Sequence, residues 1–309
     1  MAIHSLPRPL AGCESCKDFY QRLVEMYHLW AAVPNDPGAG GLFQAIREEY
    51  EQHVASHMRK QDIMKTIVTA IARQTQYYFQ RLETTNWSSR RPCPQQMYLE
   101  HPDLQGKHET FLASCQQLLV SPTVAIVGSR RTTAYGKRLI DALVRAIAAF
   151  PFQTTILSGV CPGADEAAHE AALRAGLPTV GILPLIRYSR LRLLQEKILR
   201  TGGYLLSEYP QHTPWRNSLY LERDGIITAL ADVVIVIQAG IHSGSMATVH
   251  QAIEQGKPVW VPRSVREDAL AYPGQYSGIR HLLLNQQATG FQLSPEDMTR
   301  LQTLLTPGR

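Results

Sequence analysis

Short apolar runs alternate with amphipathic stretches of helical length along much of this chain, beginning at Thr123. The apolar runs predict strands at 124–127, 155–157, 178–183, 204–206, 232–237 and 258–261. The stretches between them predict helices at 135–150, 164–175, 190–200, 223–231 and 245–255. Continuous runs of β-branched residues are typical of strands that are buried on both faces. The repeated strand–helix units therefore predict an α/β fold, a Rossmann-like doubly wound parallel sheet.

The residues before this alternation follow a different pattern. Apolar side chains recur every three or four residues at 16–30, and the stretch 42–82 contains neither glycine nor proline, so both indicate helices. The segment 108–119 is also compatible with a helix. The predicted divisions are a mostly α-helical N-terminal region, a linker or connecting segment, the Rossmann-like domain and a C-terminal helix or tail, at 1–88, 89–121, 122–290 and 291–309 respectively.

The loop after the first predicted strand contains residues suited to an anionic ligand. In doubly wound sheets, ligands bind at the carboxyl ends of the strands, where the strand order reverses. Gly128 permits close approach of a ligand to the backbone, and Ser129, Arg130, Arg131 and Thr133 offer donors to phosphate beside a helix start. A simple turn with solvated arginines is the alternative. The G-x-G-x-x-G and G-x-x-x-x-G-K-[ST] fingerprints are absent, which disfavours ordinary dinucleotide and P-loop sites.

Two further loops follow strands in the same way. Ser158 and Gly159 precede a predicted helix on which we expect structural roles for Asp165, as the helix cap, and for His169, as a hydrogen-bonded and partly buried side chain. After the run 232–237, small hydroxyl-bearing residues begin a helix and predict a cradle of backbone amides, with a capped turn as the alternative. These residues are Ser243, Gly244, Ser245 and Thr248. Two such loops at neighbouring strands favour a phosphate site.

The order of these loop motifs resembles the DprA/Smf family of DNA-processing proteins over about 165 residues. The matching positions are Gly128-Ser129-Arg130 with Thr133, Tyr135 and Gly136; Ser158-Gly159 with Gly163, Asp165, Ala168 and His169; Leu205-Leu206-Ser207-Glu208-Tyr209-Pro210; Ser243-Gly244-Ser245 with Thr248; and Ser277-Gly278 with Leu282-Leu283. The resemblance implies a Rossmann-like domain that binds single-stranded DNA in a basic pocket. It also implies a homodimer that protects incoming DNA and loads a RecA-type recombinase, without catalysis and without a cofactor.

The resemblance, together with the loop chemistry, gives a set of expected contacts to the nucleic-acid backbone. That set is Gly128, Ser129, Arg130, Arg131, Thr133, Ser158, Gly159, Arg223, Ser243, Gly244, Ser245 and Thr248. Trp215 is expected to stack on a base, because it follows a predicted strand at the carboxyl edge of the sheet. Asp224 is a second expected base contact.

The chain departs from the family pattern at Arg223-Asp224-Gly225, where the family has Arg-Asn-Arg. A carboxylate near a phosphate path opposes DNA binding, but it is able to accept a hydrogen bond from a ribose hydroxyl or a base amine. A sensor of a small nucleotide, or a LOG-like phosphoribohydrolase acting on nucleoside monophosphates, is therefore the alternative function. The LOG-like signature has a glutamate where this chain has Gln251, which disfavours that enzyme.

Charge and cysteine content limit the remaining possibilities. The net charge of +5 and the pI of about 9.0 permit an anionic ligand without requiring one. The chain has no membrane-length apolar run and does not begin like a signal peptide, so we expect a cytoplasmic protein. Cys13 and Cys16, with His53 and His57, have spacings that suit zinc. Because the two pairs lie in separate predicted elements, we expect no metal site.

Overall fold

The computed structural model describes residues 81, 85–87, 96–100, 108–112, 122–186, 191–263 and 266–306. They all belong to one compact unit, which comprises Tyr78–Ala113 and Ser121–Thr306. Most of the predicted helical region at 1–88, and the possible zinc ligands at 13, 16, 53 and 57, lie outside the described residues. Within the described ranges, no helix is both long enough and apolar enough to span a membrane.

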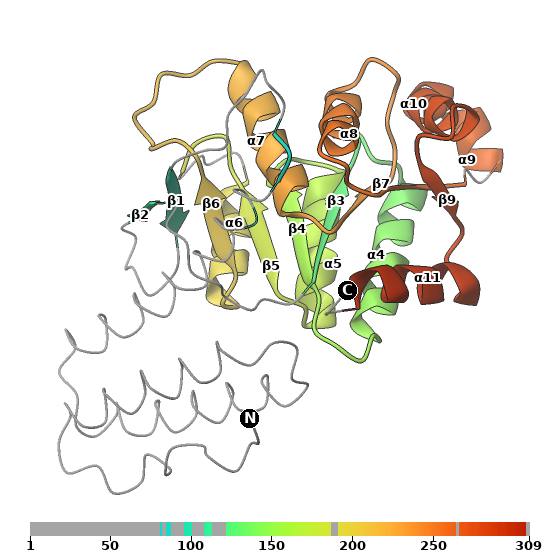
Figure 1. The fold of residues 1–309 in the computed structure, drawn as a ribbon, viewed down its shortest axis with the longest axis horizontal. Coiled ribbons are helices and arrows are strands. Elements are labelled where there is room, and N and C mark those ends of the chain that lie inside the picture. Colours follow the sequence, from blue (N-terminus) through green and yellow to red (C-terminus); the bar gives the residue numbers. More distant parts are fainter. Residues whose placement is uncertain are drawn as a thin grey trace, which may run out of the picture. The chain divides into compact units, whose positions relative to one another are not determined.

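A nine-stranded sheet forms the centre of the described part, in the order β2-β1-β6-β5-β4-β3-β7-β8-β9 (Figure 1). Strands β3 to β9 run parallel, β1 is antiparallel to β6, and β2 is antiparallel to β1. The strands are β1 Gln96–Glu100, β2 His108–Leu112, β3 Thr123–Val127, β4 Thr155–Gly159, β5 Thr179–Ile182, β6 Tyr204–Ser207, β7 Val233–Val236, β8 Val259–Pro262 and β9 Thr289–Phe291. The predicted Rossmann-like α/β fold is confirmed.

Helices connect the parallel strands and cover the sheet (Figure 1). They are α4 Ala134–Ala148, α5 Ala164–Ala175, α6 Arg192–Arg200, α7 Ser218–Leu230, α8 Gly244–Glu254, α9 Arg266–Ala271, α10 Pro273–Leu284 and α11 Pro295–Leu305. The helices α4 and α5 pack in one core with alternate residues of β3, Val124 and Ile126. The chain moves outward from β3 to β6, and then returns through α7 to β7 on the other side of β3. Right-handed crossovers therefore place α4 and α8 on opposite faces.

Strand β3 is buried over all five residues, as its β-branched and apolar sequence predicts. It pairs in register with β7, from Val124 opposite Val233 to Val127 opposite Val236. Its other neighbour is β4. The order of strands reverses between β3 and β7, because the chain reaches β4 directly from β3 but reaches β7 only from β6. This reversal is the point at which a doubly wound sheet binds ligands.

The segment 89–121 contributes two strands to the sheet. The predicted helix at 108–119 is wrong for His108–Leu112, which forms β2 and pairs with β1 from Glu100 opposite His108 to Gln96 opposite Leu112. In β1, Met97 and Leu99 are buried while Tyr98 and Glu100 are only partly buried, the period of two of a sheet. Pairing with this edge outweighs the weak helical preference of the segment. The domain boundaries remain predictions.

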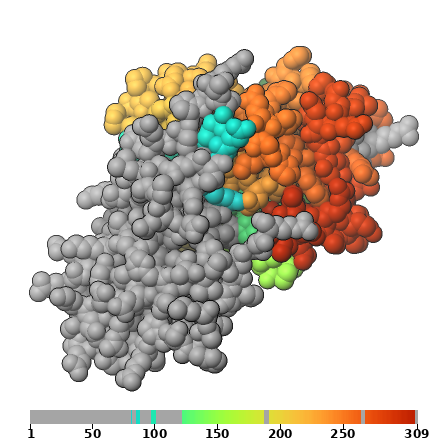
Figure 2. Space-filling model, viewed as in Figure 1, coloured from blue at the N-terminus to red at the C-terminus, as the bar shows by residue number. Residues whose placement is uncertain are grey.

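The C-terminal residues complete the same domain. Leu301 and Leu305 of α11 are buried in the core that contains Val124 and Ile126. The predicted C-terminal helix therefore packs against the sheet. Figure 2 shows the residues from α9 to α11, coloured orange to red, forming a continuous part of the visible described surface.

Candidate functional site

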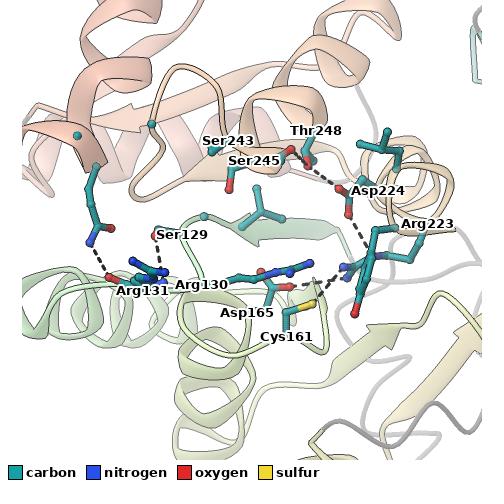
Figure 3. Close-up of a pocket in the computed structure, with 18 residues that line it drawn as sticks. Ser129, Arg130, Arg131, Cys161, Asp165, Arg223, Asp224, Ser243, Ser245 and Thr248 are labelled. Carbon is teal, nitrogen blue, oxygen red and sulfur yellow. Dashed lines mark hydrogen bonds and ion pairs between the residues drawn. The ribbon is translucent and has the colours of Figure 1, made fainter. Parts of the chain in front are cut away.

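A cavity of about 600 Å³ opens at the carboxyl ends of β3 and β7, where the strand order reverses (Figure 3). Such a volume falls in the range of small-ligand sites. Its lining comes from loops and helix starts that are distant in sequence. The lining residues are Val127, Gly128, Ser129, Arg130, Arg131, Cys161, Asp165, Tyr220, Leu221, Arg223, Asp224, Gly240, Ser243, Gly244, Ser245, Thr248, Gly274 and Gln275.

The loop after β3 brings two arginines to this cavity. Gly128 lets the chain pass close to its neighbours, since a Cβ there would lie 3.0 Å from the Cβ of Ala164 and 3.1 Å from the Gln238 carbonyl oxygen. The Ser129 amide donates to the Gln238 carbonyl at 2.7 Å, and the Arg131 amide donates to Ser129 Oγ at 3.1 Å. These amides are therefore committed within the protein. Arg130 and Arg131 are both exposed, so their guanidinium groups are the donors that this loop offers to a ligand.

The start of α8 supplies the opposite side of the cavity (Figure 3). Ser243 is the N-cap residue in extended conformation, but its side chain makes no capping hydrogen bond. Its Oγ is buried and has no hydrogen-bond partner among the described residues. Helix starts leave amides without intrahelical acceptors, and the helix dipole favours an anion there. Gly244 and Ser245 extend this donor-rich surface into the cavity.

Arg223 on α7 lies between two carboxylates at one end of the cavity (Figure 3). Its Nη1 is 3.7 Å from Asp165 Oδ2, and its Nε is 3.1 Å from Asp224 Oδ1. The Nη1 also donates to the Ile182 carbonyl at 3.3 Å, and Nη2 lies 3.4 Å from Cys161 Sγ. The side chain of Arg223 is only 5% exposed. We refer to Asp165, Arg223 and Asp224 as the buried triad.

Burial sets the charge state of the triad. Burial raises the pKa of Asp165 to about 6, although the positive charge of Arg223 opposes this shift. Burial also raises the pKa of Asp224, again opposed by Arg223 and by a hydrogen bond that Thr248 donates at 3.1 Å. Burial raises the pKa of the Cys161 thiol as well. The guanidinium between them favours the charged form of both carboxylates and so opposes the effect of burial.

Most of the predicted backbone contacts line this cavity. The exceptions are Thr133, Ser158 and Gly159, whose groups are used inside the protein. Thr133 caps α4 by accepting from the Gly136 amide at 3.1 Å, and Ser158 Oγ donates to the Ile126 carbonyl at 2.6 Å. Gly159 makes room for the buried arginine, because a Cβ there would overlap the guanidinium of Arg223.

Of the two predicted base contacts, one lines the cavity and one lies outside it. Asp224 lines the cavity, whereas Trp215 does not. Trp215 is 46% exposed and packs edge-on against Tyr220, with 5.4 Å between the ring centroids. Tyr220 is itself a lining residue, and the guanidinium of Arg130 lies 4.7 Å from the centre of its ring. Tyr220 was not predicted as a site residue from the sequence, because it lies before the predicted helix at 223–231, whereas α7 begins at Ser218.

The predicted capping role of Asp165 is wrong. The N-cap of α5 is Gly163, and no side chain caps the helix. Gly163 has a φ of +93°, and a Cβ there would lie 2.4 Å from the Ser129 carbonyl, so the residue allows the loop after β3 to rest on the start of α5. The first amide of α5, that of Ala164, donates to that same carbonyl at 3.1 Å. Asp165 is thereby left to face Arg223.

His169 lies behind the triad in the interior. It is fully buried, with Nε2 2.9 Å from the Gly159 carbonyl and Nδ1 2.7 Å from Thr179 Oγ1. Because a carbonyl only accepts, Nε2 carries the proton, while the Thr179 hydroxyl has both Nδ1 and the Ile156 carbonyl, at 3.0 Å, within reach of its one proton. Burial lowers the pKa of His169 to about 4, so the ring is neutral.

Gln238 holds the loops around the cavity together. Its Oε1 accepts from the Thr133 amide at 2.9 Å, and its Nε2 lies 3.0 Å from Thr133 Oγ1. The same Nε2 lies 3.0 Å from Asp268 Oδ2 and 2.8 Å from the Tyr276 hydroxyl. The loop after β3 is thus linked to α9 and α10. The role of Gln238 could be suspected from the sequence only because a polar residue directly follows the apolar run 232–237.

The family model and the related proteins that match this chain all belong to one group of DNA-processing proteins. Residues 111–300 match the family model of DNA recombination-mediator protein A. DNA processing protein DprA of Bacillus subtilis is 35% identical over 146 residues, which cover 46% of this chain and 48% of that protein. Protein Smf of Escherichia coli is 34% identical over 141 residues, which cover 44% of this chain and 37% of that protein. The match thus spans about half of these relatives or less.

A solved structure shares the fold as well. DNA processing protein A from Helicobacter pylori, described for its single-stranded DNA binding mode, superposes with a TM-score of 0.51 and 29% sequence identity. The superposition covers 59% of this chain and 80% of the other. The matched residues include strands β3 to β9, the loops after β3, β4 and β7, and all residues that line the cavity. The chain belongs to the DNA recombination-mediator protein A family, whose members include the DprA and Smf DNA-processing proteins.

Proposed function

We propose that this protein binds single-stranded DNA through the cavity at the carboxyl ends of β3 and β7. The observation that carries the proposal is the convergence of two donor groups on one cavity: the exposed Arg130 and Arg131, and the start of α8 with Ser243. Guanidinium groups and helix starts both recur in proteins that bind phosphate. The related protein described for single-stranded DNA binding supports the same ligand.

The ring of Tyr220 adds an aromatic surface beside these donors. It lines the cavity, and Arg130 lies over it at 4.7 Å. Proteins that bind single strands combine a basic groove with aromatic rings on which bases stack. Tyr220 takes the stacking role that the sequence suggested for Trp215, while Trp215 supports the ring from its edge.

The wider activity follows the family resemblance. We propose that the protein protects incoming DNA, loads a RecA-type recombinase and acts as a homodimer, with no catalytic step and no cofactor. The phosphate contacts proposed here are those of the cavity: Gly128, Ser129, Arg130, Arg131, Ser243, Gly244 and Ser245. Thr248 is left out because its hydroxyl donates to Asp224.

The buried triad supports a second candidate, the binding of a free nucleotide. Asp165 and Asp224 bring negative charge to the cavity, which a polyanion would avoid and a single nucleotide with one phosphate at the arginines would tolerate. The LOG-like hydrolase remains disfavoured. Gln251 holds the position of the glutamate, and its amide donates to the Leu221 carbonyl at 3.0 Å.

Fluorescence anisotropy with a labelled single strand of about 12 nucleotides tests the proposal, with unlabelled nucleoside monophosphates as competitors. We expect the strand to bind and Arg130→Ala to weaken its binding about tenfold, since one charge-assisted contact is worth about 1.4 kcal/mol. Arg192→Ala, which removes an exposed arginine of α6 outside the cavity, is the charge-matched control and should leave binding unchanged.

Two results would contradict the proposal. Tight binding of a monophosphate with no affinity for the strand would establish the free-nucleotide function instead. Release of free base from a nucleoside monophosphate would establish a hydrolase.

A further inference from the structure

One end of the cavity is acidic, although the loop after β3 is basic. The carboxylates of Asp165 and Asp224 both line the cavity, and Figure 3 shows them on two sides of Arg223. Their side chains are 11% and 15% exposed, so each is mostly buried and presents only a small part of its surface at the cavity wall. Two carboxylates with one guanidinium carry a net charge of −1 when all three groups are ionised.

Both carboxylates retain the capacity to accept further hydrogen bonds. The contact from Arg223 Nη1 to Asp165 is 3.7 Å long, which exceeds hydrogen-bond length. Asp224 accepts from Thr248 through Oδ2, and its Oδ1 lies 3.1 Å from an arginine Nε that has no aligned hydrogen bond. A carboxylate accepts about four hydrogen bonds. Acceptor positions therefore remain on both groups at the cavity wall.

Charge decides which ligand group suits this wall. A phosphate would be repelled by the carboxylates, and it has better partners at Arg130 and Arg131. A metal ion would compete with Arg223, which already lies between the two carboxylates, and the described residues contain no cluster of three or more metal ligands. A neutral N–H or O–H donor fits, because it supplies hydrogen bonds without adding charge.

We propose that Asp165 and Asp224 form a nucleobase subsite that accepts the exocyclic amine of cytosine or adenine and disfavours thymine. Cytosine and adenine carry an N–H₂ donor at the edge where thymine carries a carbonyl oxygen. The thymine carbonyl would direct its lone pairs at the buried carboxylates. With the phosphate at the arginines, the cavity of about 600 Å³ has room for the base at the triad. This inference rests on the proposed binding of single-stranded DNA.

The experiment compares labelled oligo(dC), oligo(dA) and oligo(dT) of about 12 nucleotides at one salt concentration. We expect oligo(dC) and oligo(dA) to bind about 5-fold to 10-fold more tightly than oligo(dT), the discrimination given by one base contact. In Asp224→Asn the preference should narrow to within about 2-fold, because an amide offers the thymine carbonyl a donor as well. Glu254→Gln removes an exposed carboxylate of α8 and should keep the preference.

Thermal unfolding tests whether Asp224→Asn is folded. If it is not, Asp165→Asn takes its place, with the same narrowing expected. Equal affinity of the wild-type protein for oligo(dC) and oligo(dT), or a preference that survives both substitutions, would overturn the inference and leave the proposed function standing.

Two further arms identify the donor and separate the two proposals. If oligo(rU) binds as tightly as oligo(dC), the ribose hydroxyl is the donor and the base subsite is wrong. If no strand binds, the proposed function fails. Direct titration of the protein with dCMP and with dTMP by calorimetry then decides the inference separately: a preference for dCMP that Asp224→Asn abolishes supports the subsite, and equal binding overturns it.

Discussion

Arg130 and Arg223 line the same cavity, but their surroundings differ. Arg130 is exposed and lies over the ring of Tyr220, whereas Arg223 is 5% exposed and lies between Asp165 and Asp224. An exposed guanidinium keeps its donors for a ligand. A buried one is committed to its carboxylates, since leaving any of these charges unpaired costs several kcal/mol. From the sequence both arginines are expected on the phosphate path, but only the exposed one can turn to a phosphate without leaving two buried carboxylates without their counter-charge.

The largest effect should come from removing the buried arginine. Arg223→Leu leaves two buried carboxylates without their counter-charge, and we expect a loss of about 3–5 kcal/mol in the free energy of unfolding by urea denaturation. Arg216→Ala is the matched comparison. It removes an arginine whose side chain is 47% exposed and paired with Glu222, and it should cost much less than Arg223→Leu because solvent screens this pair. Similar losses in the two variants would contradict the distinction between the arginines.

The pH dependence of stability should change when Asp165 loses its charge. Burial raises the pKa of Asp165 to about 6 and lowers the pKa of His169 to about 4. Between these values, the folded protein keeps a proton on Asp165 that the unfolded chain has released. It also lacks a proton on His169 that the unfolded chain holds. The first difference makes stability fall as pH rises and the second makes it rise, so they largely cancel.

Asp165→Asn removes only the first of these contributions. Its unfolding free energy should therefore rise with pH between about 4 and 6 more steeply than that of the wild type, by up to about 1.4 kcal/mol per pH unit. Urea denaturation at several pH values measures both slopes. Parallel curves for the two proteins would show that Asp165 titrates as it does in the unfolded chain.

The contact between the loop after β3 and the loop after β4 should depend on Gly163. Gly163 and Gly176 both have positive φ, but a Cβ on Gly163 would lie 2.4 Å from the Ser129 carbonyl, whereas a Cβ on Gly176 meets nothing within 4 Å. Gly176→Ala should cost about 1–2 kcal/mol for the left-handed backbone alone. Gly163→Ala should cost more and should also weaken binding of single strands, because the loop after β3 must move. Equal losses of unfolding free energy in the two variants would mean that the contact between Gly163 and the Ser129 carbonyl does not restrict the residue at 163.

Much of the fold could be predicted from the sequence, because buried parallel strands have a local signature. The run at 232–237 needs no partner to be recognised as a strand, and the structure places β7 at Val233–Val236. Strand β2 could not be predicted, since His108–Leu112 is a strand only through its pairing with β1. The same limit applied to the site. The loops were visible as motifs, but the ion pairs of Arg223 with Asp165 and Asp224 join three segments that only the tertiary structure brings together.

The salt dependence of single-strand binding tests the central claim most directly. Binding of a single strand weakens with salt in proportion to the number of phosphate contacts, with a slope of about −0.7 per contact in a logarithmic plot. We predict that the double variant Arg130→Ala/Arg131→Ala reduces the magnitude of this slope by about 1.4 relative to the wild type, which is about 0.7 for each exposed arginine. A slope that stays at the wild-type value would contradict the account, because the exposed arginines would then not be the groups that contact phosphate.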